Sequence, residues 1–101
     1  RFKVLCDMAS EMFDDLAERI RKGTFAHDDG SVLSDEDKAA LNRFGLKLEY
    51  LSKRLKEMKK LHNDPNELNK EEVLIMREVG RVLDRVNRRQ DGALEICLAN
   101  I

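Results

Sequence analysis

The segment between residues 35 and 62 carries the pattern that most constrains the fold. Six large apolar side chains recur there at alternating intervals of three and four residues: Leu41, Phe44, Leu48, Leu51, Leu55 and Met58. This spacing places all six on one face of an α-helix, and a run this long is typical of a helix packed against other helices. Leu46, Tyr50 and Leu61 widen the apolar stripe, which indicates more than one neighbouring helix.

Two more segments show helical spacing, one on each side of this helix. The first spans residues 2–22 and ends at Gly23, a residue type that commonly follows a helix. Its apolar face consists of Phe2, Leu5, Ala9, Met12, Phe13, Leu16 and Ile20. The other spans residues 67–100, and its apolar face includes Val73, Ile75, Met76, Val79, Val82, Leu83 and Val86. The sequence therefore predicts three amphipathic helices.

Capping residues indicate where the helices begin and end. Ser34 is followed three positions later by an aspartate, which is a variant of the capping box at the start of the second helix. Pro65 cannot continue a helix and disfavours helical backbone at the residue before it, so the second helix ends shortly before Pro65. Asn69, with a glutamate three positions later, is the next capping signal, and Asn66 is a rival start for the third helix.

Three long helices with short connections favour an all-α fold, an antiparallel up-down-up three-helix bundle. The 101 residues suit a single domain. The C-terminal end has two alternatives: the third helix continues through Gly92 to about residue 100, or a short fourth helix begins after Gly92. Because the chain starts at Arg1 and ends within an apolar run, we expect a domain excised from a longer protein.

The charge balance argues against a strong overall attraction to polyanions. Charged residues make up 39% of the chain, but the net charge is −1. No run of 18 apolar residues predicts a membrane span. The two cysteines, Cys6 and Cys97, lack the spacing of a metal site or a disulfide framework. We expect buried thiols in a reducing intracellular compartment, cytoplasmic or nuclear.

No motif predicts an enzyme or a cofactor site. Catalytic carboxylates need burial or a like-charged neighbour, whereas the acidic pairs of this chain fall on exposed faces or at helix starts. His27 and His62 have no second ligand at zinc spacing. Residues 25–36 imitate a calcium loop with Gly30 at the turn, but Phe25 stands where a carboxylate ligand is needed. We therefore expect a non-catalytic protein without cofactor, metal or small-molecule substrate.

The sharpest local charge asymmetry lies along residues 38–62, which hold eight Lys and Arg residues against two Glu. Such a stretch can contact phosphates of an anionic membrane or a nucleic acid. The candidate residues for that contact are Lys53, Arg54, Lys56, Lys59 and Lys60. Aromatic residues do not interleave the cations, and nearby acidic residues can neutralise them, so polyanion binding is the alternative hypothesis.

The apolar faces favour a protein–protein interaction or scaffold module of the adaptor kind. Their total width exceeds what a small bundle needs to bury, and such excess marks an interface. The module would dock a partner helix, or pair with a second copy as a coiled-coil homodimer. Gly45 and Gly80, inside the predicted helices, are tolerated substitutions or points of close helix approach. The expected partner-binding residues are Lys47, Tyr50, Arg54, Leu61, Leu94, Leu98 and Ile101.

Overall fold

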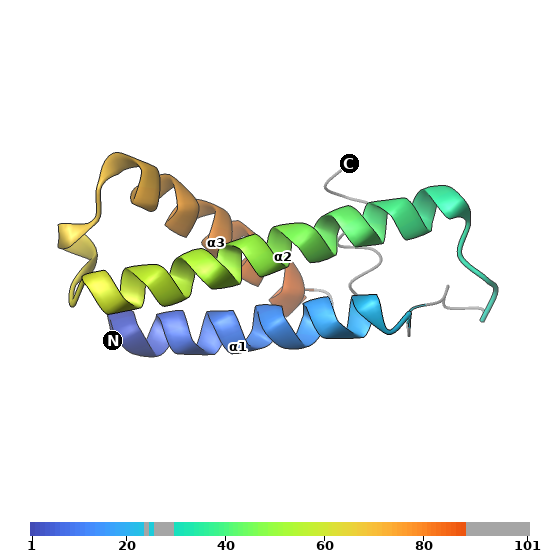
Figure 1. Cartoon of the computed structure of the whole chain (residues 1–101), viewed down its shortest axis with the longest axis horizontal. Coiled ribbons are helices and arrows are strands. Elements are labelled where there is room, and N and C mark those ends of the chain that lie inside the picture. The colour runs from blue at the N-terminus through green and yellow to red at the C-terminus, as the bar shows by residue number, and fades with distance from the viewer. Residues whose placement is uncertain (24, 26–29, 89–101) are drawn as a thin grey trace.

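The computed structural model describes residues 1–23, 25 and 30–88, and this part of the chain contains three α-helices, a short 3₁₀ turn and no strand. The elements are α1 (Phe2–Arg21), α2 (Asp35–Leu61), η1 (Pro65–Glu67) and α3 (Lys70–Arg88), as Figure 1 shows. The all-α prediction is confirmed. The predicted break at Gly92 lies outside the described residues.

The helices α1 and α2 form an antiparallel pair that lies side by side along most of its length (Figure 1). All six heptad residues of α2 that the sequence predicts are buried. They face the buried residues of α1, which are Phe2, Cys6, Ala9, Phe13, Leu16, Ala17 and Ile20. Leu5 differs from its prediction, because it is 40% exposed on the flank of α1 that turns away from α2.

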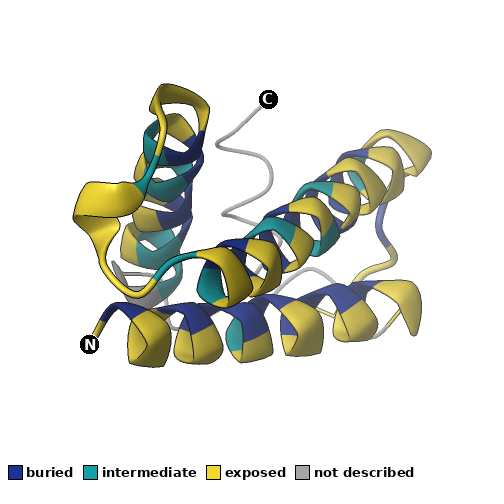
Figure 2. Ribbon diagram, turned by 60° about the vertical axis from the view of Figure 1, so that its left-hand side comes forward, coloured by how far each residue is buried: buried dark blue, intermediate teal, exposed yellow. Residues whose placement is uncertain are grey.

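The third helix leaves the end of α2, runs back in the general direction of α1 and crosses the α1–α2 pair obliquely (Figures 1 and 2). Its buried residues Ile75, Val79 and Val82 belong to the same hydrophobic core as α1 and α2. The up-down-up order of directions is thus confirmed. Because α3 is inclined, it approaches α2 over a much shorter stretch than α1 does.

Capping geometry explains the boundaries of α2 and α3. The side chain of Ser34 accepts a hydrogen bond from the backbone N–H of Asp37 at 3.1 Å, as its capping signal predicts. The third helix begins at Lys70 rather than near residue 67, because Pro65 starts a 3₁₀ turn that occupies the preceding residues. Of the two rival starts, Asn69 is therefore the residue that caps α3.

Candidate functional site

The side of α2 opposite its core face carries large apolar residues in solvent. Leu46, Tyr50 and Leu61 are 67%, 51% and 71% exposed. The sequence predicted that these side chains widen the contact with neighbouring helices, and this is corrected here: α1 and α3 leave that side of α2 uncovered in the described part of the chain (Figure 2). We call this region the outer surface of α2, and it consists of Leu46, Tyr50 and Leu61 with the exposed cations Arg43, Lys53 and Lys60 and the exposed Glu57, which pairs with Arg54.

Two other predicted partner-binding residues lie on the edge of α2 that faces α3. The ammonium group of Lys47 pairs with the carboxylate of Glu78. Arg54 pairs through Nη1 with Glu71 at 2.8 Å and donates from the same nitrogen to the hydroxyl of Tyr50 at 3.1 Å. Both cations therefore tie α3 to α2. The remaining predicted contacts, Leu94, Leu98 and Ile101, lie outside the described residues.

The basic cluster of α2 is divided between paired and unpaired cations. Lys56 lies 2.8 Å from Asp14, and Lys59 lies 2.5 Å from Asp7, so both ammonium groups bridge α2 to α1. Lys53 and Lys60 are exposed. No ion pair joins either of them to a carboxylate of the described residues. Of the five candidate polyanion-binding residues, Lys53 and Lys60 alone are unpaired in this part of the chain.

Asp14 belongs to a polar contact that the sequence did not reveal. The buried hydroxyl of Ser52 donates a hydrogen bond to Asp14 Oδ1 at 2.6 Å, and Lys56 donates to Oδ2. Partial burial raises the pKa of the Asp14 carboxyl, but the hydrogen bonds from Lys56 and Ser52 outweigh it and hold that pKa below its ordinary value. The contact fastens the middle of α1 to α2.

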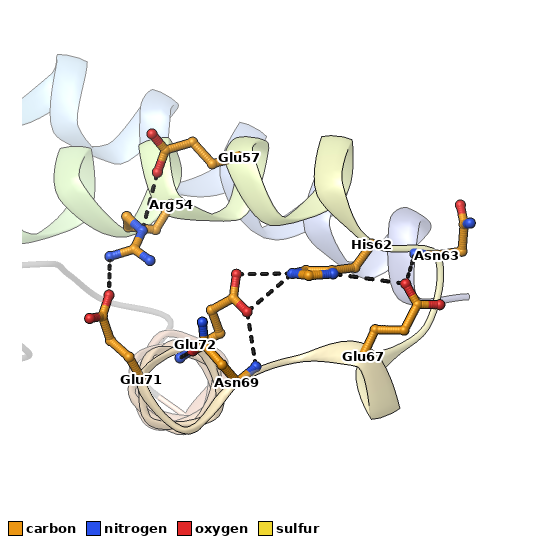
Figure 3. Close-up of polar contacts among 8 residues, drawn as sticks. All are labelled: Arg54, Glu57, His62, Asn63, Glu67, Asn69, Glu71 and Glu72. Atoms are coloured by element: carbon orange, nitrogen blue, oxygen red, sulfur yellow. Dashed lines mark hydrogen bonds and ion pairs between the residues drawn. The ribbon is translucent and has the colours of Figure 1, made fainter.

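A second polar contact joins the end of α2 to the start of α3 (Figure 3). His62 Nε2 lies 3.0 and 3.1 Å from the two carboxylate oxygens of Glu72, whose residue is only 5% exposed. The N–H of Asn69 donates to Glu72 Oε1 at 3.0 Å, and the N–H of Glu72 donates to Asn69 Oδ1 at 2.8 Å. These two bonds form a complete capping box.

The capping box affects the ionisation of Glu72. The hydrogen bond from the Asn69 backbone is the largest cause that lowers the pKa of Glu72, and the contact with His62 lowers it further against the opposing effect of burial. The cap was visible in the sequence as Asn69 and Glu72 at the right spacing. The contact with His62 was not visible in the sequence, because no local pattern links a residue at the end of one helix to the start of the next.

A smaller apolar patch on α1 was also missed. Val4 and Met8 are each 59% exposed and lie one helical turn apart, next to Leu5. The sequence contains the spacing, but Phe2 and Cys6 compete with these residues for the core face of the same turns. The structure resolves that competition in favour of Phe2 and Cys6.

The described residues show few features of other site types. Among them, no group of three or more His, Cys, Asp or Glu residues is arranged to hold a metal ion. None of the helices in this part of the chain combines the length and the apolar composition needed to cross a membrane. Asp14, Ser52, Lys53 and Lys60 help to line a solvent-open groove of about 400 Å³ between α1 and α2.

Comparison of the chain with protein-family models, with curated proteins and with solved structures gives no match.

Proposed function

We propose that this chain is a non-catalytic helical module that binds another protein through the outer surface of α2. The observation that carries the proposal is the exposure of Leu46, Tyr50 and Leu61 on one side of a helix whose other sides already contact α1 and α3. Exposed apolar side chains rimmed by charges are typical of surfaces that a partner covers. Leu74 on α3 is also exposed, and it lies one helical turn from Glu71 and Glu78, which pair with Arg54 and Lys47 of α2.

The pairing of the basic residues supports this proposal over polyanion binding. Arg54, Lys56 and Lys59 already contact carboxylates within the domain. A phosphate ligand would have to compete with those carboxylates for each cation. Polyanion binding also gives no role to the apolar side chains of the outer surface of α2.

Site-directed photo-crosslinking tests the proposal. A benzoylphenylalanine in place of Tyr50 should capture a protein partner under native conditions, whereas the same group in place of Glu11, exposed on α1, should not. The captured partner is then purified and its affinity measured by calorimetry. The triple variant Leu46→Ser, Tyr50→Ser, Leu61→Ser should bind it at least about tenfold more weakly, because the contacts of exposed apolar anchors dominate such interfaces.

A variant of α1 provides the matched control. Val4→Ser with Met8→Ser also removes exposed apolar side chains, but from a different helix. It should leave the affinity within about twofold, since exposed substitutions outside an interface have small effects. Retention of full affinity by the α2 variant, with loss by the α1 variant, contradicts the proposal and moves the binding surface to α1.

A further inference from the structure

The cations of α2 that follow Lys38 fall into two groups, according to whether a carboxylate of the described residues pairs with them. The residues that face α1 or α3 are neutralised within the domain: Lys47 by Glu78, Arg54 by Glu71, Lys56 by Asp14 and Lys59 by Asp7. The second group consists of Arg43, Lys53 and Lys60, which are exposed. None of these three makes an ion pair with any residue that the structure describes.

The unpaired cations follow the same line along the helix as the exposed apolar residues. Arg43, Leu46, Tyr50 and Lys53 succeed one another at intervals of three, four and three residues, so they share one side of α2. The next intervals of four and three residues lead to Glu57, which pairs with Arg54, and then to Lys60, with Leu61 next to it at the end of the helix. The outer surface of α2 therefore carries three apolar anchors and three unpaired cations, together with one carboxylate that Arg54 already neutralises.

We infer that the partner of this surface is an acidic amphipathic helix, an inference that rests on the proposed function. Residues 43–61 span about 27 Å at 1.5 Å per residue. A helix of similar length, laid along α2, can insert apolar side chains between Leu46, Tyr50 and Leu61. Its flanking Asp and Glu residues then meet Arg43, Lys53 and Lys60, which supply the charge complementarity.

A second copy of this chain fits the surface less well. Parallel pairing of two α2 helices would place each of the three free cations beside its own counterpart. Antiparallel pairing that brings Leu46 against Leu61 of the second copy would bring the unpaired Lys53 residues of the two copies together near the centre. Like charges that face one another disfavour both arrangements.

Two synthetic helical peptides test the inference. Both carry leucines at the intervals of the outer surface of α2, four and eleven residues apart, and they differ only in flanking positions that are all glutamate or all lysine. Fluorescence anisotropy should show that the acidic peptide binds at least about tenfold more tightly than the basic one. This preference should shrink as salt rises from about 0.05 M to about 0.5 M.

Charge-reversal variants locate the effect. Arg43→Glu, Lys53→Glu and Lys60→Glu together should reverse the preference so that the basic peptide binds more tightly. Three exposed cations elsewhere provide the matched control, because Lys3→Glu, Lys70→Glu and Arg77→Glu change the net charge equally and should keep the acidic preference. The variant with Leu46, Tyr50 and Leu61 changed to serine should bind both peptides more weakly, and by the same factor.

The outcomes separate this inference from the proposed function. Equal affinity for the two peptides, or no binding of the acidic one, overturns the acidic helix as partner. If the triple serine variant of α2 still binds the photo-crosslinked partner more weakly than the parent does, the proposed function stands even though the acidic helix is excluded as the partner. Binding of phosphatidylserine vesicles without binding of the acidic peptide, or a stable dimer in sedimentation velocity, overturns the inference in favour of a lipid surface or a second copy.

Discussion

Two buried serines in this domain differ in what their hydroxyl groups hold together. The Ser52 hydroxyl reaches from α2 to Asp14 on α1 at 2.6 Å, whereas the Ser10 hydroxyl donates to the carbonyl of Asp7 in its own helix at 3.1 Å. A hydroxyl that bonds within its own helix adds little, because the backbone there is already paired. A hydroxyl that bonds across helices stabilises their packing.

We therefore expect Ser52→Ala to lower the free energy of unfolding by about 1 kcal/mol, the usual contribution of one hydrogen bond. Ser10→Ala should change it by less than about 0.5 kcal/mol. Urea denaturation followed by circular dichroism measures both. Equal losses in the two variants would show that burial of the side chain, not the bond between helices, determines the effect.

Single residues illustrate what the sequence can and cannot predict. Leu48 and Leu55 were predicted to be buried because the apolar repeat alone determines which face of α2 is covered. Ser52 and Glu72 were not identified as buried, because their polar side chains are tolerated in the core only through partners on other helices. Leu46, Tyr50 and Leu61 were predicted to widen the contact with neighbouring helices and are exposed instead, because the apolar pattern does not state whether a neighbouring helix covers a side chain.

Among the helices, the start of α3 depends on Asn69. Its side chain accepts the hydrogen bond of the Glu72 N–H at 2.8 Å, which satisfies one of the free donors of the first turn. We expect Asn69→Ala to lower the free energy of unfolding by about 1 kcal/mol. Asn66→Ala is the control, because Asn66 lies in η1 and does not cap α3, and its loss should be within about 0.5 kcal/mol. A larger loss for Asn66→Ala would contradict the assigned boundary.

The two glycines inside helices have different surroundings. A Cβ atom added at Gly45 would lie 3.4 Å from Cγ2 of Ile20, which is contact with α1, whereas one added at Gly80 would meet nothing within 4 Å. The predicted close helix approach thus applies to Gly45 and not to Gly80.

Alanine at these two positions should therefore stabilise the domain unequally. Gly80→Ala should raise the free energy of unfolding by about 1 kcal/mol, the difference in helix propensity. Gly45→Ala should raise it by less, since the added Cβ would lie at the lower limit of ordinary van der Waals contact with Ile20 and leaves no room for adjustment. Thermal unfolding of both variants measures the order, and a loss of stability in Gly80→Ala would show that this side of α3 is covered.

The extent of α2 was predicted more closely than the arrangement of the helices. The second helix was predicted over residues 35–62 and is found at Asp35–Leu61, because caps and apolar spacing are local signals. The inclination of α3 was not predicted, since a crossing direction depends on side chains of three helices at once.

In the whole domain, α1 and α2 form the main body and α3 is attached through a small apolar contact with charged groups at its border. The ion pairs of Lys47 with Glu78 and of Arg54 with Glu71 lie at that border. The contact of Glu72 with His62 lies where the end of α2 meets the start of α3 (Figure 3). Ion pairs also join α1 to α2, but the apolar contact there is much larger, so ionised carboxylates make up a larger share of the attachment of α3.

This dependence predicts that acid destabilises the domain. The hydrogen bond from Lys47 lowers the pKa of Glu78, and the Asn69 backbone and His62 lower that of Glu72, both from an ordinary value of 4.5. The pKa of Asp14 is likewise lowered from 3.8. A carboxyl group whose folded pKa is depressed contributes stability that is present above its unfolded pKa and is lost as the pH falls through the folded value. The free energy of unfolding should therefore decline once the pH drops below 4.5.

Glu78→Gln separates the contribution of one carboxylate from the rest. The amide of glutamine carries no charge and cannot form the ion pair with Lys47. The variant should therefore be less stable than the parent at neutral pH, and its free energy of unfolding should fall less on acidification. Urea titrations at a series of pH values measure both slopes. The same titrations in about 1 M salt should show a shallower decline, because screening weakens the exposed pairs. The free energy of unfolding of the parent and of the variant could instead decline identically between neutral and acid pH. Protonation of Glu78 would then not account for the acid dependence, which would come from Asp14 and Glu72.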